Sequence, residues 1–211
     1  MTAANLQGVM TPWLTTIVSH NIPRDSHEAH RDILSWHEGC PDMPRVLWAT
    51  PRQGVMVVQG PAPIRRSDVR YRDCRMSEST PIALHWCAGD RIRWSLIGCP
   101  TKSLGRGGGT RPDGRPRPTR KPVRTPLADD DERDAWLHRK LIYLSDIRSV
   151  GQQLAPSIAR KPGLGPPRTL TRHLWSGTAI VVDPDGLRAA LLGGIGPGKA
   201  YGCGLLMVSA A

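Results

Sequence analysis

The sequence of 211 residues contains no phenylalanine and only five lysines among its 29 basic residues. It also lacks any apolar run close to the ~18 residues that a membrane-spanning helix needs. Its first ten residues have neither the basic start nor the apolar core of a signal peptide. We therefore expect no membrane partner and a cytoplasmic location. Because phenylalanine is absent, we expect most of the seven tryptophans to fill core positions.

Cysteine is also scarce: the chain has five, an odd number, and no two of them form a close pair. This spacing argues against both a disulfide framework and a zinc knuckle. A chain of 211 residues buries enough surface to fold without such cross-links. The cysteines are therefore typical of a reducing, cytoplasmic setting.

Acidic residues are outnumbered, 18 against 29, which gives a formal net charge of +11. Arginine supplies 24 of the basic residues, and guanidinium groups suit bidentate contacts to phosphate and stacking on bases. Eight basic residues and one acid lie between Lys102 and Arg124. A GC-rich genome would explain arginine in place of lysine, but neither the net charge nor this clustering. We therefore expect a polyanion, first of all nucleic acid, as the partner.

Hydrophobic periodicity predicts mixed strands and helices in the first half of the chain. The expected strands lie at 13–18, 45–48, 54–59, 82–87 and 91–97, with a turn at 50–53 and a helix at 25–36. Asp25 is a good N-cap for that helix. Residues 1–11 show no periodicity, and we expect them to form a disordered leader.

The second half of the chain continues the same mixture of strands and helices. Residues 103–126 are expected to form a mobile basic loop because they carry too little apolar surface to order themselves. The expected elements are a helix at 130–144 capped by its acidic run, an irregular segment at 151–167, one long or two short strands at 170–182, a helix from 183 to 192 and a strand at 204–208. This order of strands and helices predicts an α+β fold of two tandem ferredoxin-like domains with antiparallel sheets, residues 12–88 and 89–211.

His27 and His30 are the only histidines at helical i, i+3 spacing, so both rings lie on one side of the first expected helix. His37 would extend that side. One interpretation is a solvated helix face. A second is a metal site, which needs a third ligand that the sequence does not show. A third is acid–base catalysis, because histidine changes its protonation state near neutral pH.

A glycine-rich loop at 193–204 contains Gly196, Gly198 and Lys199. Glycine permits positive φ and lets the backbone approach a phosphate closely. The loop is not a P-loop, because neither Ser nor Thr follows Lys199, and it is not a Rossmann fingerprint. A tight connection between a helix and a strand is the alternative interpretation.

From Gly194 to Leu206 the sequence resembles the C-terminal glycine-rich loop of the CasE family, the CRISPR-precursor endoribonuclease of the type I-E Cascade complex. Three further segments agree in order and spacing: Arg24 to His30 before an apolar helix, Pro100 to Lys102 after a strand, and Ala135 to Leu141 in the later helix. The similarity begins near Trp13 and spans nearly all of the remaining chain.

This resemblance implies two tandem RRM-related, ferredoxin-like domains. It also implies cleavage of CRISPR repeat RNA at the base of its stem-loop, without a metal or other cofactor. The enzyme would keep the mature guide RNA and would bind the Cascade backbone subunit.

The resemblance places the family's catalytic histidine at His30. It would assist attack by a ribose 2′-OH on the adjacent phosphate, leaving a 2′,3′-cyclic phosphate and a 5′-OH. Several family members have a tyrosine three residues earlier, where this chain has His27. His27 is then the expected second proton carrier, while a catalytically inactive RNA-binding subunit and a metal-dependent hydrolase remain alternatives. Developing negative charge needs a cation, and the candidates are Arg24, Arg31 and Lys199.

The resemblance also implies a basic hairpin in the groove of the RNA stem. The best match by position holds Arg160, Lys161, Arg168 and Arg172. These side chains would read shape and phosphates, because the major groove of RNA is deep and narrow. Lys102 and the loop that follows would add affinity independent of sequence, and Gly196 and Gly198 complete the expected RNA-binding set. Taken singly, each of these arginines is more typical of a solvated surface than of an RNA contact.

Overall fold

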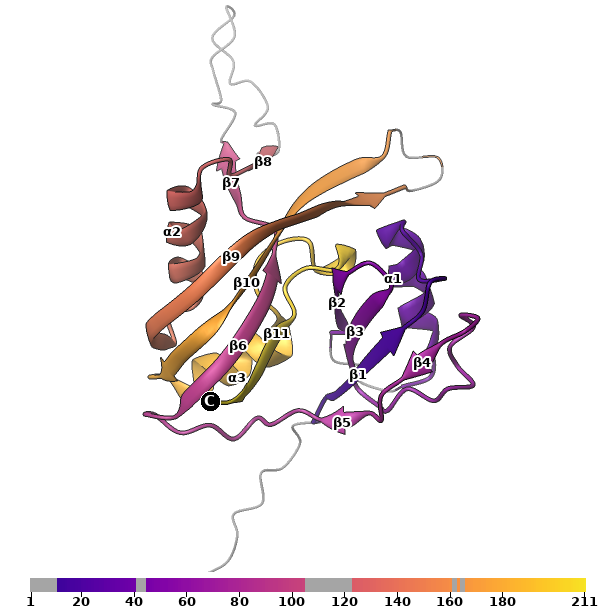
Figure 1. The fold of residues 1–211 in the computed structure, drawn as a ribbon, viewed down its shortest axis with the longest axis horizontal. Helices are drawn as coiled ribbons and strands as arrows, with labels where there is room; N and C mark the ends of the chain where they lie inside the picture. Colours follow the sequence, from indigo (N-terminus) through magenta and orange to yellow (C-terminus); the bar gives the residue numbers. More distant parts are fainter. Residues whose placement is uncertain (1–10, 41–44, 105–122, 161–162, 164–165) are drawn as a thin grey trace, which may run out of the picture.

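The computed structural model of the protein describes residues 11–40, 45–104, 123–160, 163 and 166–211. In chain order the elements are β1 (Trp13–Val18), α1 (Ser26–Ser35), β2 (Leu47–Arg52), β3 (Val55–Gly60), β4 (Arg75–Met76), β5 (Thr80–Pro81), β6 (Arg91–Gly98), β7 (Thr101–Leu104), β8 (Val123–Pro126), α2 (Asp130–Lys140), β9 (Leu144–Ala159), β10 (Arg168–Val181), α3 (Pro184–Gly193), the 3₁₀ turn η1 (Lys199–Tyr201) and β11 (Leu206–Ala210). Figure 1 shows the strands gathered into two main sheets, with the β9–β10 hairpin reaching from one sheet toward α1 beside the other.

The first sheet is antiparallel and has the order β2–β3–β1–β4, with β5 also paired to β1. Ile17 on β1 lies opposite Met56 on β3, and both side chains are fully buried. Ala29 and Ile33 of α1 belong to the same core, so α1 packs on this sheet through the apolar face that its spacing predicts. The order is that of a ferredoxin-like unit in which irregular residues 61–74 stand in place of the second helix.

The second sheet is antiparallel with the order β11–β6–β10–β9. Its elements follow the chain order β6, α2, β9, β10, α3, β11, which is the ferredoxin-like β-α-β-β-α-β pattern. On β6 the buried Ile92, Trp94 and Leu96 alternate with more exposed residues and share a core with α2 and α3. The predicted α+β class with antiparallel sheets is therefore confirmed.

A third apolar cluster joins the two sheets. Leu47 and Val57 of the first sheet pack with Ile97 of β6 and with Cys203 and Leu205 before β11. Beside this cluster, Gln59 Nε2 donates to the backbone carbonyl of Leu191 at 2.7 Å, and the Gln59 side chain is buried. The two sheets therefore share part of one core.

Four tryptophans are core residues, as the absence of phenylalanine predicts. Trp48, Trp94, Trp136 and Trp175 are all 4% exposed or less. Trp136 of α2 stacks on Trp175 of β10 with ring centroids 5.7 Å apart. Large indole rings therefore supply the packing between α2 and its sheet.

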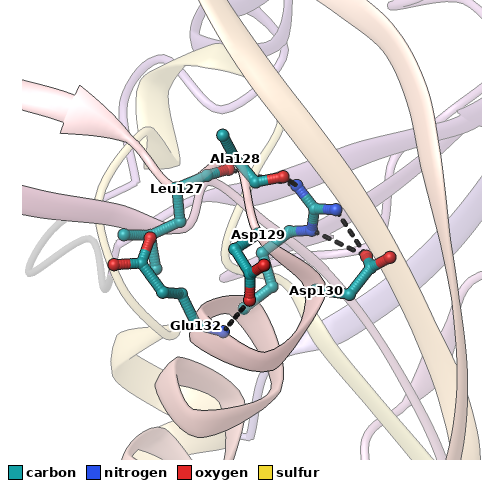
Figure 2. A network of polar contacts seen from close by, with 6 residues as sticks. Leu127, Ala128, Asp129, Asp130 and Glu132 are labelled. Atoms are coloured by element: carbon teal, nitrogen blue, oxygen red, sulfur yellow. Dashed lines mark hydrogen bonds and ion pairs between the residues drawn. The ribbon is translucent and has the colours of Figure 1, made fainter.

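The acidic run at the start of α2 caps the helix, as predicted. The Asp129 carboxylate accepts the backbone N–H of Glu132 at 3.1 Å. Arg133 donates to the carbonyls of Leu127 and Ala128 at 3.2 and 2.7 Å and also binds the Asp130 carboxylate, as Figure 2 shows. Acidic groups lie at the positive end of the helix dipole, where they are favourable.

The prediction of an irregular segment at 151–167 is largely wrong. Residues up to Ala159 belong to β9, a strand of 16 residues that pairs with β10. Most β9 residues are exposed, so the segment lacks the apolar alternation by which strands are found. The strand predicted at 170–182 is confirmed, and it forms one long strand, β10, which begins at Arg168.

The strand predicted at 82–87 does not form. Residues 82–87 are assigned to no strand in the structure, yet Leu84 is buried and Ile82 and Trp86 pack on the core that the second sheet shares with α2 and α3. The alternating pattern is therefore real, but it reflects an extended segment with one face on the core and no partner strand.

Several boundaries also move. The turn predicted at 50–53 lies at Gln53 and Gly54, because a register irregularity between Ala49 and Arg52 lets β2 continue through Pro51. The helix predicted to reach 144 ends at Lys140. The outer ends of the predicted basic loop are paired strands, β7 and β8. The rest of that loop, 105–122, and the leader up to residue 10 lie outside the described residues.

Candidate active site

The helix that carries both candidate catalytic histidines begins at a strong cap. Asp25 precedes α1 in an extended conformation, and its Oδ1 accepts the backbone N–H groups of His27 and Glu28 at 2.8 and 3.3 Å. These are N–H groups that an α-helix leaves without partners at its first turn. The predicted role of Asp25 is confirmed, and the cap sets where His27 and His30 lie along the helix.

The start of α1 is also fastened to β9. The second carboxylate oxygen of Asp25 accepts the backbone N–H of Arg160 at 3.0 Å, and Ser26 Oγ donates to the carbonyl of Ile158 at 2.8 Å. Asp25 and Ile158 also form an isolated parallel bridge. The hairpin that reaches toward α1 in Figure 1 is therefore hydrogen-bonded to it.

The three histidines of this region differ in their surroundings. His27 and His30 are half-buried on α1, whereas His37 is 2% exposed. His37 Nδ1 donates to the carbonyl of Ile33 at 3.0 Å, and its Nε2 faces Gly60, where a Cβ would lie only 2.0 Å away. His37 is therefore a core residue and does not extend the side of α1 that carries His27 and His30.

The glycine-rich loop lies next to α1. Its 3₁₀ turn η1 packs against α1, β2 and β9, and Ser157 Oγ of β9 donates to the carbonyl of Tyr201 at 3.1 Å. Gly202 has φ of 77°, and a Cβ there would meet Trp48 at 3.0 Å. The loop does connect α3 to β11 tightly, but its 3₁₀ turn, which begins at Lys199, also packs against the helix with the two histidines.

Lys199 lies in electropositive surroundings. Its Nζ donates to the carbonyl of Gly193 at 2.7 Å. Partial burial, followed by the nearby Arg45 and Lys140, lowers the pKa of Lys199. Arg45 is an exposed residue that the sequence analysis did not single out. An anion beside Lys199 would relieve this repulsion among like charges.

Most of the predicted RNA-binding residues lie on three segments: the β9–β10 hairpin, α1 with the residue before it, and the glycine-rich loop. Arg160 and Arg168 are exposed near the tip of the β9–β10 hairpin, where Arg168 pairs with Ala159. Arg24 and Arg31 flank or lie on α1 and are exposed. Gly196 and Gly198, with φ of 70° and 82°, belong to the loop beside that helix. Lys161 lies outside the described residues.

Lys102 is separate from this group. It lies on β7, on the side of the hairpin away from α1 in Figure 1, and its Nζ forms an ion pair with Glu132 of α2 at 2.7 Å. The structure therefore brings α1, the hairpin and the glycine-rich loop together, and leaves Lys102 at the base of the β7–β8 pair.

Arg172 has partners that the sequence does not reveal. Its Nε donates to the carbonyl of Ala155 at 3.0 Å, and its Nη1 donates to Thr50 Oγ1 at 2.7 Å. Thr50 lies on β2, 122 residues away in the chain. No local signal in the sequence indicates this contact, which holds a guanidinium between the two sheets.

In the described part of the chain, no three His, Cys, Asp or Glu side chains lie together in a group that could hold a metal ion. Among the helices described, none has the length and apolar character needed to cross a membrane.

Comparison with known proteins agrees with this arrangement. Cse3 of Thermus thermophilus, solved with an RNA representing a pre-cleavage complex, is 25% identical with a TM-score of 0.70, over 94% of this chain and 99% of that chain. CRISPR endoribonuclease Cse3 bound to a 19 nt RNA is 26% identical with a TM-score of 0.70, again over 94% and 99%. Cas6e from Escherichia coli K-12, 21% identical with a TM-score of 0.68 over 95% and 100%, shares the fold.

A search of curated proteins finds no match. The model of the CRISPR associated protein family, in contrast, matches residues 15–210, which is nearly the whole chain. Together with the structural likeness to Cse3, this match confirms the resemblance to CasE. The chain therefore belongs to the CRISPR associated protein family.

Proposed function

We propose that the protein is an endoribonuclease that cleaves CRISPR repeat RNA at the base of its stem-loop without a metal ion. The product would carry a 2′,3′-cyclic phosphate and the second fragment a 5′-OH. The enzyme would then keep the guide RNA, and would bind the Cascade backbone subunit in the cytoplasm.

One observation carries this proposal: α1, with His27 and His30, meets the basic β9–β10 hairpin and the Lys199 turn at one place. The helix that carries two groups able to move protons is thus in contact with two segments that carry cations able to bind phosphate. The likeness to Cse3, an endoribonuclease solved with RNA, supports RNA as the substrate.

In the proposed reaction the 2′-oxygen of a ribose attacks the adjacent phosphorus. His30, as the neutral imidazole, takes the proton of the 2′-OH during this attack, and the bond between phosphorus and the 5′-oxygen breaks as the new bond forms. The leaving 5′-oxygen takes up a proton, for which His27 is the proposed donor. Lys199, Arg24 and Arg31 are the proposed stabilisers of negative charge on the phosphorane.

The proposed contacts to the RNA stem come from the hairpin, through Arg160, Lys161 and Arg168, and Arg172 is a fourth proposed RNA-binding residue, held between the two sheets. Lys102 and the basic segment after it would add contacts to phosphates. Because such contacts release counterions, binding would weaken steeply as salt rises. Gly196 and Gly198 would let the backbone of the loop approach the RNA.

The test is to incubate a labelled repeat stem-loop with wild type, His30→Ala and His138→Ala in EDTA and to resolve the product ends. His138 is an exposed residue of α2, so its variant is the matched control. Wild type and His138→Ala should make one cut with a cyclic phosphate. His30→Ala should bind but not cut, and equal cutting by this variant would overturn the proposal.

A second candidate is an RNA-binding subunit without catalysis. It is favoured by His27, which stands where several CasE proteins have tyrosine. Tight binding of the repeat RNA by wild type without any cut would support this candidate. Cleavage that needs a metal ion and stops in EDTA would instead indicate a metal-dependent hydrolase.

A further inference from the structure

A cavity of about 370 Å³ lies between the two sheets, beside the start of α1. Four segments line it: residues before and at the start of α1, the β2–β3 hairpin, the outer part of β9, and Arg172 of β10. This volume is within the range of ~300–1,000 Å³ typical of small-molecule pockets. The cavity is therefore large enough to receive part of a ligand.

Arg172 brings an uncompensated positive charge to this cavity. Its two hydrogen-bonded nitrogens bind only neutral acceptors on Ala155 and Thr50, and its Nη2 makes no hydrogen bond to any described residue. Among the ion pairs of the described chain, none involves Arg172. Burial lowers the pKa of Arg172, yet arginine stays charged at neutral pH.

A buried charge is usually paired with an opposite one, because removal from water costs free energy. Here the half-buried guanidinium is instead held in place by neutral groups, and its Nη2 has no hydrogen-bond partner among the described residues. This is the arrangement expected of a site that waits for an anion, and a planar guanidinium suits phosphate in particular. Arg24 and Arg52, both exposed, add positive charge to the lining of the cavity.

The rest of the lining is largely apolar. Ile22 and Pro23 contribute from the segment before α1, and Leu154 and Pro156 from β9. Trp48 also lines the cavity, and its indole N–H has no hydrogen-bond partner among the described residues. Apolar walls with a few fixed polar groups favour a ligand with a flat apolar body and an anionic end.

Ser26 at the start of α1 also lines the cavity, so the cavity adjoins the helix that carries His27. A chain of RNA that passes α1 would therefore meet the cavity within a short distance of the proposed cut. An unpaired nucleotide next to the stem has both a base to bury and a phosphate to bind, whereas a paired nucleotide keeps its base in the stack.

We propose that this cavity binds one unpaired nucleotide that flanks the RNA stem, with its base between the apolar walls and a phosphate at Arg172. This inference rests on the proposed function and adds to it a single-stranded part of the substrate. The β2–β3 hairpin then takes part in RNA binding through Thr50, which orients Arg172.

The test measures binding rather than cutting, with RNA that carries a 2′-deoxy sugar at the cleavage site. Three probes are compared: the bare stem-loop, the stem-loop with one nucleotide added at the 5′ or 3′ end, and the same extension without its base. The proteins are wild type, Ala155→Trp, Thr50→Val and Arg93→Gln. Ala155 is exposed and lines the cavity, so tryptophan there fills it, whereas Arg93 is an exposed control on β6.

We expect one of the two extensions to tighten binding by wild type and by Arg93→Gln about tenfold, which is about 1.4 kcal/mol. The extension without a base should give less than half of that gain in free energy. Ala155→Trp should lose the gain, and Thr50→Val should reduce it. Circular dichroism of each variant shows whether it is folded.

Two results would overturn this inference while the proposed function stands: equal binding of the bare and extended stem-loops, or a full gain retained by Ala155→Trp. A gain that does not need the base would show that the cavity binds phosphate alone, and would overturn the nucleotide site. Failure of wild type to bind the bare stem-loop would instead count against the proposed function itself.

Discussion

The carboxylate of Asp25 accepts the backbone N–H of Arg160 at 3.0 Å across 135 residues of chain. Its other oxygen caps α1 at the N–H of His27, 2.8 Å away. One side chain therefore sets both where the helix begins and where it lies against the β9–β10 hairpin. The positions of His27 and His30 relative to the basic hairpin depend on this carboxylate.

Replacing Asp25 should therefore affect both stability and cleavage. Asp25→Ala removes a helix cap and leaves the N–H of Arg160 without its acceptor, so we expect a loss of about 1–2 kcal/mol in unfolding free energy. We also expect cleavage to fall at least about tenfold, because α1 is no longer fastened to the hairpin. Urea unfolding and single-turnover cleavage measure the two effects.

Asp129→Ala is the matched control for this change, because Asp129 caps α2 through one hydrogen bond and has no hydrogen bond to α1 in the described part of the chain. It should lose stability and keep its cleavage rate. If both variants cleave like wild type, Asp25 has no role in positioning the histidines.

Position 27 should accept tyrosine. His27→Ala should lower single-turnover cleavage by about 10²- to 10⁴-fold, the usual contribution of a general acid or base. His27→Tyr, which installs the residue of several CasE proteins, should recover most of that loss, since a phenol also carries a proton. Unchanged cleavage by His27→Ala would show that the ring at this position is only a solvated residue of α1.

Stability should depend on pH through His173. Burial first, and then Arg133, lower the pKa of His173, against the opposing effect of Asp130 and Asp134. The native state therefore favours the neutral ring. The stability that this preference contributes is fully present above the pKa of histidine in the unfolded chain, about 6.5, and is lost as the pH falls from there toward the lower pKa of the folded state.

Replacing His173 should make the free energy of unfolding depend less on pH on the acid side. Between about pH 7.5 and 5.5, wild type should lose more unfolding free energy than His173→Gln, as measured by urea titration. His85→Gln is the control, since His85 is exposed and should leave the profile of wild type unchanged. Parallel profiles for wild type and His173→Gln would contradict this prediction.

The contact of Gly202 with Trp48 should make alanine costly there. Gly202 has φ of 77° and a Cβ would lie 3.0 Å from Trp48, whereas Gly39 has φ of 84° with nothing within 4 Å. Gly39→Ala should therefore show only the backbone strain, about 1–2 kcal/mol. Gly202→Ala should lose more than this in thermal or urea unfolding, and an equal loss would exclude a steric contribution from Trp48.

The elements that the sequence predicts well are those with one buried face. On β6 and α1, burial on one side leaves a period of two or of about 3.6 in the apolar residues, so both elements are found close to their observed ends. β9 was missed because much of it is exposed on both faces, and its order comes from hydrogen bonds to β10. Such pairing leaves no local pattern.

The candidate site likewise contains local features that the sequence predicts and long-range contacts that it does not. Asp25 is recognisable as a cap because capping is local, within three residues. Its bond to Arg160 and the bond of Arg172 to Thr50 join residues more than 100 positions apart. These contacts depend on how the two sheets pack, which a single sequence does not display. The catalytic and RNA-binding roles themselves stay predictions.

The hydrogen bond from Gln59 of β3 to the carbonyl of Leu191 ties the first sheet to α3 of the second half. Leu47 and Val57 of the first sheet are covered by residues of the second half, so a fragment that ends near residue 88 would expose them to water. Neither half can then reach its native stability alone, and the two sheets should gain it together. Calorimetry should record a single cooperative transition, with the early strands protected from hydrogen exchange only after β11 has docked.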